Sequence, residues 1–572
     1  MIYARIMSCL LIMTAIGCTP GAHHMEPDAA VAFNWFEYQG NDDAFHAPLE
    51  EGQFLNPILA GFYPDPSITR AGNYFYLVHS SFSWSPGVPL FRSQDLVNWE
   101  SLGYILTTAE QLPLQNQQVS RGIYAPTIRY HDGVFYLITT LVDVRGNFIV
   151  TATDPAGPWS EPILLPEVGG IDPDIFFDDD GKVYIAHNDA PVGEPLYEGH
   201  RAIWLWEFDL AAKKIIPDSG RVIVNGGVDL AKQPIWIEAP HIFKKDGWYY
   251  LTCAEGGTGY NHSQVIFRTR HLHEPFVPFE RNPILTQRDL DIDRPNPITT
   301  AGHADFIQTE NGEWWAVFLA TRAYDKTFYN TGRETFLLPV RWEDEWPIIL
   351  DAGQEIPYRV NAPRISTARK IFAPLTGNFR WRDNFDQSEL HHHWNFLRSN
   401  NADWHRLSKN QLVIDARSIS LASLEQPAFI ARRQQHMRYT ASTELNLPQH
   451  PGLSAGLVAF QNETAHYYLG VKRIEDGYKL FIEQAKQAQP TIIKSVHIAN
   501  QDTQQTMILG IEGDKGEISF YYQTPKGPKI FLARALDGKL LSTEVAGGFV
   551  GTYLGMHVRN EPASTSREQN GD

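Results

Sequence analysis

Five segments in the first two-thirds of the chain share one pattern, a turn containing glycine followed directly by an aromatic-rich strand. The turn glycines are Gly72, Gly133, Gly181, Gly247 and Gly312. Asp-Gly and Asn-Gly between apolar runs are strong hairpin signals, because both residues accept the positive φ of a tight primed turn. Intervals of roughly 50 to 65 residues leave room for a four-stranded blade with its loops. The repeat predicts a five-bladed β-propeller, with a single-sheet sandwich as the alternative.

The same repeat predicts which side chains meet at the centre of the propeller. Counting back eleven or twelve residues from the last aromatic residue of each unit leads to Asp65, Tyr124, Asp172, Glu238 and His303. Equivalent positions on the innermost strands of a propeller surround its central channel, so we expect these five side chains at one end of the channel. Three of them are carboxylic acids, and each has a proline within two residues that restricts the local backbone.

Three acids at one phase of a repeat are unusual. A single acid in such a turn usually accepts hydrogen bonds from backbone N–H groups. Three carboxylates crowded on one axis repel each other and are costly to desolvate, so stability alone does not explain them. A bound cation would explain the cluster. Acid–base chemistry is the commoner reason, because neighbouring carboxyl groups drive their pKa values apart, so that one stays protonated while another stays ionised.

Seven motifs in order resemble those of glycoside hydrolase family 43, over about residues 55–350. They are Asn56–Ser67, Gly122–Pro126, Ile171–Pro173, Glu238–His241, Ala254–Thr258, Gly302–Asp305 and Gly332–Thr335. Within the family, the chain is most similar to the β-xylosidase and α-L-arabinofuranosidase branch, which carries an additional C-terminal β-sandwich. The resemblance implies an inverting, exo-acting glycoside hydrolase that releases terminal xylose or arabinose units from plant hemicellulose oligosaccharides.

The resemblance also assigns catalytic roles. It makes Asp65 the general base, Glu238 the general acid, and Asp172 the residue that orients the acid and raises its pKa. Inversion requires one carboxylate to deprotonate water and one protonated carboxyl across the bond, about 6.5–9.5 Å away. An ionised Asp172 beside Glu238 would disfavour a second negative charge and so hold the proton on Glu238.

Four further residues match positions that contact sugar or lie near it in the family. Arg333 matches an arginine that reaches the sugar hydroxyls, with a salt bridge to Glu334 or another neighbour as the alternative. Phe82 matches an aromatic residue against the sugar ring, and Tyr124 stands where many relatives have tryptophan. His303 matches an axial histidine that contacts substrate or lies over an ion, so a structural calcium near His303 is expected, with a core histidine as the alternative. The resemblance requires no cofactor and no catalytic metal.

A second domain follows the propeller. Beyond Trp346 the blade pattern ends, and short segments of period two between turn residues predict a β-sandwich of the concanavalin-like jelly-roll type. In it, the loop Gly547–Gly551 is the candidate to reach the mouth of the active site. The predicted boundaries are 51–360 for the propeller, 361–378 for a linker, 379–560 for the sandwich and 561–572 for a disordered tail.

The N-terminus indicates export. Arg5 precedes an apolar run, Met7–Ile16, which is too short to span a bilayer permanently and suits a signal peptide. The run leads to Ala15-Ile16-Gly17-Cys18, which resembles a bacterial lipoprotein cleavage box apart from Ala15. We expect a signal peptide over 1–18, a lipid anchor on Cys18 at the periplasmic or cell surface, and an N-terminal linker over 19–50. An ordinary signal peptide of a secreted protein is the alternative.

Charge restricts the partners. The formal net charge is −18, from 48 basic and 66 acidic residues, which repels polyanions and excludes nucleic acid as an expected partner. Contact with a membrane is expected only through a lipid anchor. The expected partner is a xylo- or arabino-oligosaccharide. Two alternatives remain open, an endo- or exo-arabinanase activity of the same family and a non-catalytic sugar-binding propeller on the cell surface.

Overall fold

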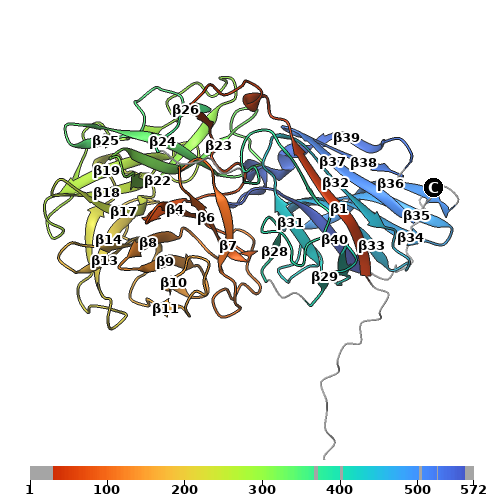
Figure 1. Ribbon diagram of the computed structural model, residues 1–572, viewed down its shortest axis with the longest axis horizontal. Helices are drawn as coiled ribbons and strands as arrows, with labels where there is room; N and C mark the ends of the chain where they lie inside the picture. Colours follow the sequence, from red (N-terminus) through yellow and green to blue (C-terminus); the bar gives the residue numbers. More distant parts are fainter. Residues whose placement is uncertain (1–29, 366–371, 400–402, 501–504, 525, 561–572) are drawn as a thin grey trace, which may run out of the picture.

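The computed structural model describes residues 30–365, 372–399, 403–500, 505–524 and 526–560. Figure 1 shows two β-domains side by side, a propeller of five small sheets and a sandwich of two large ones. This confirms the predicted all-β class, with a five-bladed β-propeller followed by a concanavalin-like β-sandwich. The predicted signal peptide, Cys18 and the tail 561–572 lie outside the described residues. None of the helices in the described part of the chain has the length and apolar character to cross a bilayer.

Each blade is an antiparallel sheet that starts at the axis and adds strands outward. The first two blades contain β3 (Ser67–Ala71), β4 (Tyr74–Val78), β6 (Gly87–Ser93) and β7 (Glu100–Leu106), then β8 (Thr127–His131), β9 (Val134–Leu141), β10 (Gly146–Ala152) and β11 (Ile163–Leu164). The third contains β12 (Ile171–Phe177), β13 (Val183–Asp189), β14 (Ala202–Asp209), β15 (Lys214–Ile215) and β16 (Arg221–Asn225). The last two contain β17 (Glu238–Lys245), β18 (Trp248–Glu255), β19 (Ser263–Thr269), β20 (Val277–Pro278) and β21 (Leu285–Thr286), then β22 (Ile298–Gln308), β23 (Trp314–Arg322), β24 (Glu334–Glu343) and β25 (Trp346–Ile348).

All five repeat turns join the innermost strand of a blade to its second strand, as predicted. In the second blade, Asp132 and Gly133 have φ of 47° and 82°, and in the fourth blade Asp246 and Gly247 have φ of 50° and 76°. Asp and Gly tolerate this left-handed region, which a hairpin of this handedness requires at both central positions. In these two blades, the sequence of the turn therefore fixes where the first strand ends and the second begins.

The five innermost strands meet around one arginine. The Arg129 guanidinium, on β8, pairs with Asp174 of β12 (Nη2–Oδ1 2.8 Å) and Asp305 of β22 (Nη1–Oδ2 2.8 Å). It also donates hydrogen bonds to Ser67 Oγ of β3 (3.3 Å) and to His241 Nδ1 of β17 (3.1 Å). Burial alone would raise the pKa of Asp305, but Arg129 lowers it to about 2. One cation thus holds together the inner strands of all five blades.

Two eight-stranded sheets form the sandwich around a common apolar core. The first sheet contains β1 (Ala30–Gly40), β27 (Arg380–Asp383), β29 (His405–Leu407), β30 (Leu412–Asp415), β32 (Arg438–Asn446), β37 (Thr506–Asp514), β38 (Glu517–Gln523) and β39 (Ile530–Asp537). The second contains β5 (Trp84–Ser85), β28 (Asn395–Leu397), β31 (Phe429–Arg433), β33 (Leu453–Asn462), β34 (Ala465–Ile474), β35 (Gly477–Lys486), β36 (Gln489–Ala499) and β40 (Tyr553–Asn560). Outside these sheets, β2 (Gln53–Leu55) pairs with β26 (Arg359–Asn361), and the short helices are η1 (Asp43–Phe45), η2 (Leu230–Lys232), η4 (Gly538–Leu541) and α1 (Thr543–Ala546).

The N-terminal linker predicted over 19–50 is wrong for residues 30–40. These residues form β1, an inner strand of the first sandwich sheet that pairs with β30, β32 and β27. Val31, Phe33, Phe36 and Tyr38 are buried in the sandwich core, which is the physical reason that this segment is ordered as a strand. The sandwich is therefore built from segments that come before and after the propeller in the sequence (Figure 1).

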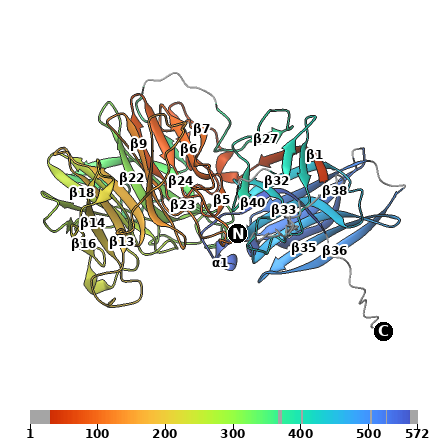
Figure 2. The ribbon, with the colours of Figure 1, turned by 90° about the horizontal axis from the view of Figure 1, so that it is seen from below.

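The two domains share a sheet and an apolar core. β5, which lies within the first blade region of the chain, pairs with β28 and so extends the second sandwich sheet into the propeller. The Trp84 ring stacks on Tyr553 with centroids 3.6 Å apart, and both rings are fully buried. Phe62 and Phe82 of the propeller belong to the same apolar cluster. In Figure 2, α1 lies at this junction between the domains.

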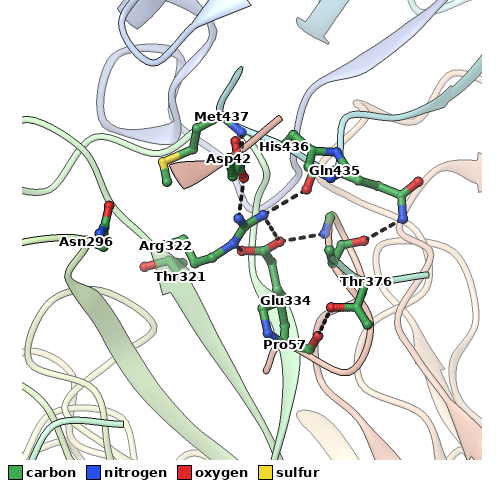
Figure 3. Close-up of polar contacts among 12 residues, drawn as sticks. Asp42, Pro57, Asn296, Thr321, Arg322, Glu334, Thr376, Gln435, His436 and Met437 are labelled. Atoms are coloured by element: carbon green, nitrogen blue, oxygen red, sulfur yellow. Dashed lines mark hydrogen bonds and ion pairs between the residues drawn. The ribbon is translucent and has the colours of Figure 1, made fainter. Parts of the chain in front are cut away.

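A buried ion-pair network crosses the same interface (Figure 3). The Arg322 side chain at the end of β23 is fully buried and pairs with Asp42 (Nη1–Oδ2 2.5 Å) and Glu334 (Nε–Oε2 2.7 Å). It also donates to the Gln435 carbonyl of the sandwich (2.8 Å), while Glu334 Oε1 accepts the Gly61 N–H (2.6 Å). Buried charges need such complete pairing, so the network fixes how the sandwich seats on the propeller.

We predict that Arg129→Met destabilises the propeller by about 3–5 kcal/mol, because it leaves two buried carboxylates without their cation. The measurement is the free energy of unfolding in urea, followed by tryptophan fluorescence. Arg341→Met is the matched control: Arg341 pairs with Glu343 and Asp351 on the surface, with its side chain 49% exposed, and its loss should cost less than about 1 kcal/mol. Equal stability of the Arg129 variant and the wild type would contradict the role of Arg129 in holding the inner strands together.

Candidate active site

One cavity of about 450 Å³ opens at the end of the propeller channel. Asp65, Asp172, Glu238 and His303 line it, each at or just before the start of an innermost strand or within that strand. Tyr124, which precedes β8, completes the set. The structure therefore brings together all five side chains that the phase of the repeat placed at the axis.

Asp65 is buried and fully engaged. Its Oδ1 pairs with Arg333 Nη1 at 2.8 Å, and its Oδ2 accepts a hydrogen bond from Ser80 Oγ at 2.5 Å. Burial alone would raise the pKa of Asp65, but the Arg333 charge and the Ser80 hydrogen bond lower it below its ordinary value. Asp65 is therefore the ionised carboxylate of the cavity.

The other two acids are shifted in the opposite direction. Burial, followed by repulsion from Asp172 and Asp65, raises the pKa of Glu238 well above its ordinary value. Burial and repulsion from Asp65 raise the pKa of Asp172 to about 7. Asp172 is tied to the segment of Glu238, because its Oδ2 accepts the Ala239 N–H at 3.2 Å. The cavity thus holds an ionised acid and a protonated acid near neutral pH.

The backbone at this end of the propeller is held in the left-handed region. Asp65, Asp172 and His303 have φ of 53°, 56° and 54° at equivalent places in three blades, and Phe82 and Ala239 have φ of 50° and 51°. Residues other than glycine rarely adopt this conformation, and they do so where the surrounding structure enforces it, often at functional sites. The repeat therefore reproduces one strained backbone geometry that turns side chains toward the axis.

Arg333 connects the acids to the rim of the cavity. Besides its pair with Asp65, its Nη1 donates to Thr258 Oγ1 at 3.0 Å. Of the alternative of a salt bridge to Glu334 or another neighbour, the pair with Glu334 is wrong, because Glu334 pairs with Arg322, and the salt bridge of Arg333 is the one to Asp65. Arg333 is only 6% exposed, and its position in the cavity lining leaves its fork of donors beside any bound ligand.

Three aromatic rings form one wall of the cavity. The Phe82 ring lies 5.1 Å from Tyr124 and stacks on Phe549 at 6.1 Å, while Tyr124 meets Phe549 edge-on at 6.0 Å. Aromatic faces of this kind pack against the apolar faces of sugars. Phe549 comes from the sandwich, in the loop Gly547–Gly551 that was predicted to reach the mouth.

The sandwich loop is seated by close backbone contacts. A side chain on Gly332 (φ 78°) would meet the Gly551 Cα at 2.9 Å, and one on Gly551 would meet the Thr331 carbonyl at 2.6 Å. The two loop segments can approach this closely only because both positions are glycine. The Phe549 N–H then donates to Ser120 Oγ at 3.0 Å. The backbone of Phe549 is thus anchored at the cavity by contacts with the propeller.

The protein groups around His303 offer few oxygen ligands for the expected calcium. Its Nδ1 lies 3.6 Å from Asp65 Oδ1, and burial lowers its pKa to about 3, so the ring is neutral. Calcium prefers six to eight oxygen ligands. The buried groups nearby are the imidazoles of His241 and His262 and the carboxylate of Asp65, which Arg333 already binds. The described residues contain no cluster of three or more His, Cys, Asp or Glu that would hold a metal ion.

Sequence reasoning missed several residues that line the cavity, among them Arg121, Arg201 and Trp236. Trp236 lies two residues before Glu238, so an aromatic residue beside a predicted acid was an available signal. Arg121 directly precedes the motif Gly122–Pro126, so it had a similar signal, whereas Arg201 lies in a loop outside the repeat phase and nothing in the sequence alone marks it. Only the fold brings them to the mouth.

The arrangement can perform acid–base chemistry on a bound sugar. It offers an ionised carboxylate to activate water, a protonated carboxyl to donate to a leaving oxygen, and an arginine with aromatic rings to hold a ring between them.

Comparison with known families agrees with this geometry. A family profile described as "Glycosyl hydrolases family 43" matches residues 54–347. A second profile, "Beta xylosidase C-terminal Concanavalin A-like domain", matches residues 382–568.

Individual relatives match over nearly their whole length. A "Xylosidase/arabinosidase" of Butyrivibrio fibrisolvens is 38% identical, over 88% of this chain and 95% of its own. A non-reducing end alpha-L-arabinofuranosidase of Bacteroides ovatus is 34% identical, over 91% and 94%. A crystal structure of a "GH43_12 retrieved from capybara gut metagenome" superposes with a TM-score of 0.87 at 39% identity, over 93% of this chain and all of that one.

Proposed function

The chain belongs to glycosyl hydrolase family 43, and on that premise we propose that it is an inverting, exo-acting glycosidase. It releases terminal xylose or arabinose units from hemicellulose oligosaccharides, the substrate class that the names of its relatives indicate. The observation that carries this proposal is the set of three carboxyl groups with opposite pKa shifts in one cavity.

In the proposed mechanism, Asp65 and Glu238 act across the glycosidic bond. Asp65 takes a proton from a water molecule, which attacks the anomeric carbon, while Glu238 gives its proton to the leaving oxygen. Asp172 supports the acid, because its proximity raises the pKa of Glu238. Arg333 orients Asp65 and leaves donors for the sugar hydroxyls.

The sandwich supports removal of single terminal units. Phe549 stacks on Phe82 and its carbonyl lies 3.5 Å from Arg333 Nη2, so a loop of the second domain covers one side of the cavity. A closed side favours a chain end over the middle of a polysaccharide. Phe82, Tyr124 and His303 complete the proposed subsite for the terminal sugar.

The remaining proposals concern cofactors and partners. All proposed chemical steps use carboxyl groups of the chain itself, so we propose that hydrolysis needs no cofactor. The net charge of −18 supports a partner that is a sugar rather than a nucleic acid.

We also propose export with a lipid anchor on Cys18. The basic residue Arg5, the apolar run Met7–Ile16 and the box that ends at Cys18 support it. The anchor would place the enzyme at a membrane surface, where oligosaccharides from outside the cell arrive.

Removing the proposed acid should affect two kinds of substrate unequally, whereas removing the proposed base should affect both equally. Wild type should release nitrophenolate from p-nitrophenyl β-D-xyloside, p-nitrophenyl α-L-arabinofuranoside or both. Glu238→Ala should lower kcat/KM on oligosaccharides by about 10²–10⁴-fold, and less on the aryl glycosides, because nitrophenolate leaves with little protonation. Asp65→Ala should impair both substrate kinds alike.

Asp180→Ala, at an exposed hairpin tip, serves as the control for these variants. Binding of sugars without release from any substrate would mean a non-catalytic propeller. Cleavage in the middle of arabinan chains would mean an endo-arabinanase.

The pH profile of kcat/KM should be bell-shaped. Activity is lost as the pH falls through the lowered pKa of Asp65, because the base must be ionised, and as the pH rises through the raised pKa of Glu238, because the acid must be protonated. Asp172→Asn removes a negative neighbour, so the pKa of Glu238 should fall and the basic limb should move to lower pH. Asp180→Asn should leave the profile in place, and an unmoved basic limb in Asp172→Asn would contradict the role of Asp172.

Lipidation can be tested in a bacterial host grown with radioactive palmitate. The full-length chain should be labelled and recovered with membranes, whereas Cys18→Ala should be unlabelled and soluble. Release of unlabelled wild type into the medium would instead indicate an ordinary signal peptide.

A further inference from the structure

Three arginines line the cavity, and they differ in their pairing. Arg333 pairs with Asp65, and Arg121 forms a bidentate pair with Asp143, with Nε–Oδ2 at 2.5 Å and Nη2–Oδ1 at 2.6 Å. Arg201 has no ion pair and no side-chain hydrogen bond with any residue that the structure describes. A half-buried guanidinium in a concave site without a carboxylate partner is unusual, because its donors are partly removed from water.

Arg201 is held in place by an indole. Its guanidinium carbon lies 4.2 Å from the centroid of the Trp236 ring, which is a close cation–π contact. Both backbones are fixed: the Gly226 N–H donates to the Arg201 carbonyl, and the Trp236 N–H donates to the Gly199 carbonyl, each at 2.9 Å. The pair is therefore a rigid feature of the rim.

The position of the pair relates it to one of the acids. Trp236 lies two residues before Glu238, and the Arg201 charge acts on Glu238, where it opposes the raised pKa. Arg201 thus works against keeping the general acid protonated, so tuning of that acid does not explain its presence. Glu238 donates its proton to the leaving oxygen in the proposed mechanism, so the side of the cavity near Glu238 is the side of the leaving group.

The carboxylate beside Gly227, in the turn whose Gly226 N–H binds the Arg201 carbonyl, does not neutralise Arg201. Glu255 accepts the Val228 N–H at 3.0 Å and forms no ion pair with any residue that the structure describes, and burial raises its pKa. The cation therefore faces the cavity with its donors available.

We propose that Arg201 and Trp236 form the subsite for the leaving group and that this subsite selects a leaving group bearing a carboxylate, such as a hexuronic acid linked to a pentose. This inference rests on the proposed function and adds to it a class of leaving group. The planar fork of Arg201 matches a carboxylate in geometry and charge, and the indole provides an apolar face for the sugar ring. A neutral sugar would use the ring face but would leave the charge of Arg201 unmatched.

The test compares two oligosaccharides that share the terminal pentose and differ only in the leaving unit, one neutral and one with a uronic acid. The readout is the ratio of kcat/KM for the acidic over the neutral substrate. Wild type should prefer the acidic substrate, and Arg201→Gln should lower the ratio by about tenfold, as expected for the loss of one charged hydrogen-bonding pair. Arg201→Lys should restore part of the ratio, because it keeps the charge without the fork.

Two controls separate this effect from general ones. Arg534→Gln makes the same change of net charge on the exposed surface of the sandwich and should leave the ratio unchanged. Raising the salt concentration to about 0.5 M should lower the ratio in wild type and not in Arg201→Gln. An unchanged ratio in Arg201→Gln, or equal losses on both substrates, would overturn the proposal.

Direct binding distinguishes failure of this inference from failure of the proposed function. Calorimetric titration of Glu238→Gln with the two oligosaccharides, with and without Arg201→Gln, reports affinity without turnover. Tighter binding of the acidic compound that disappears with Arg201→Gln supports the subsite even if wild type hydrolyses neither substrate. Equal affinity for both compounds overturns it.

Discussion

The largely buried guanidinium of Arg129 holds the inner strands of the propeller in one fixed arrangement. A buried charge requires charged partners. The carboxylates that pair with Arg129, Asp174 and Asp305, come from two other blades. The partners of Arg129 and the residues of the active site are close in sequence on the inner strands: Asp174 follows Asp172 by two residues, and Asp305 follows His303 by two. Pairing with Arg129 therefore sets the rotation of each of these strands about its own axis, and with it the direction in which the active-site residue points.

Burial acts on all three acids of the cavity, but their neighbours decide the outcome. Asp65 has a cation and a hydroxyl donor against its two oxygens, so it remains ionised. Glu238 has two carboxyls nearby, so it retains its proton. The opposite pKa shifts of the base and the acid thus arise from Arg333, which pairs with Asp65 only. Arg333 belongs to a different blade from Asp65, and the next residue, Glu334, is held by its ion pair with Arg322. Glu334 belongs to the ion-pair network between the domains, and Arg333 belongs to the cavity, so consecutive residues connect the two.

The sequence was informative where structure is local and repeated. The glycine-containing turns and the aromatic strands that follow them identified the five blades, and the phase of the repeat identified Asp65, Asp172 and Glu238 as neighbours. It was uninformative where a residue is defined by a distant partner. Arg129 looks like any polar residue on a strand, and its function depends on groups from four other blades. The same holds for Arg201 and for β1, whose alternating apolar residues indicate a strand but not the sheet that it joins.

The place of β1 has a consequence for biosynthesis. This strand leaves the ribosome ahead of the entire propeller, while β30 and β32, between which it finally lies, are made only afterwards. Until then its four buried apolar residues have no partner, and an unpaired apolar strand invites pairing with other chains. Shortening the chain from the C-terminal side would remove the strands that flank β1, so it would leave this segment unpaired and would not release a self-sufficient catalytic domain.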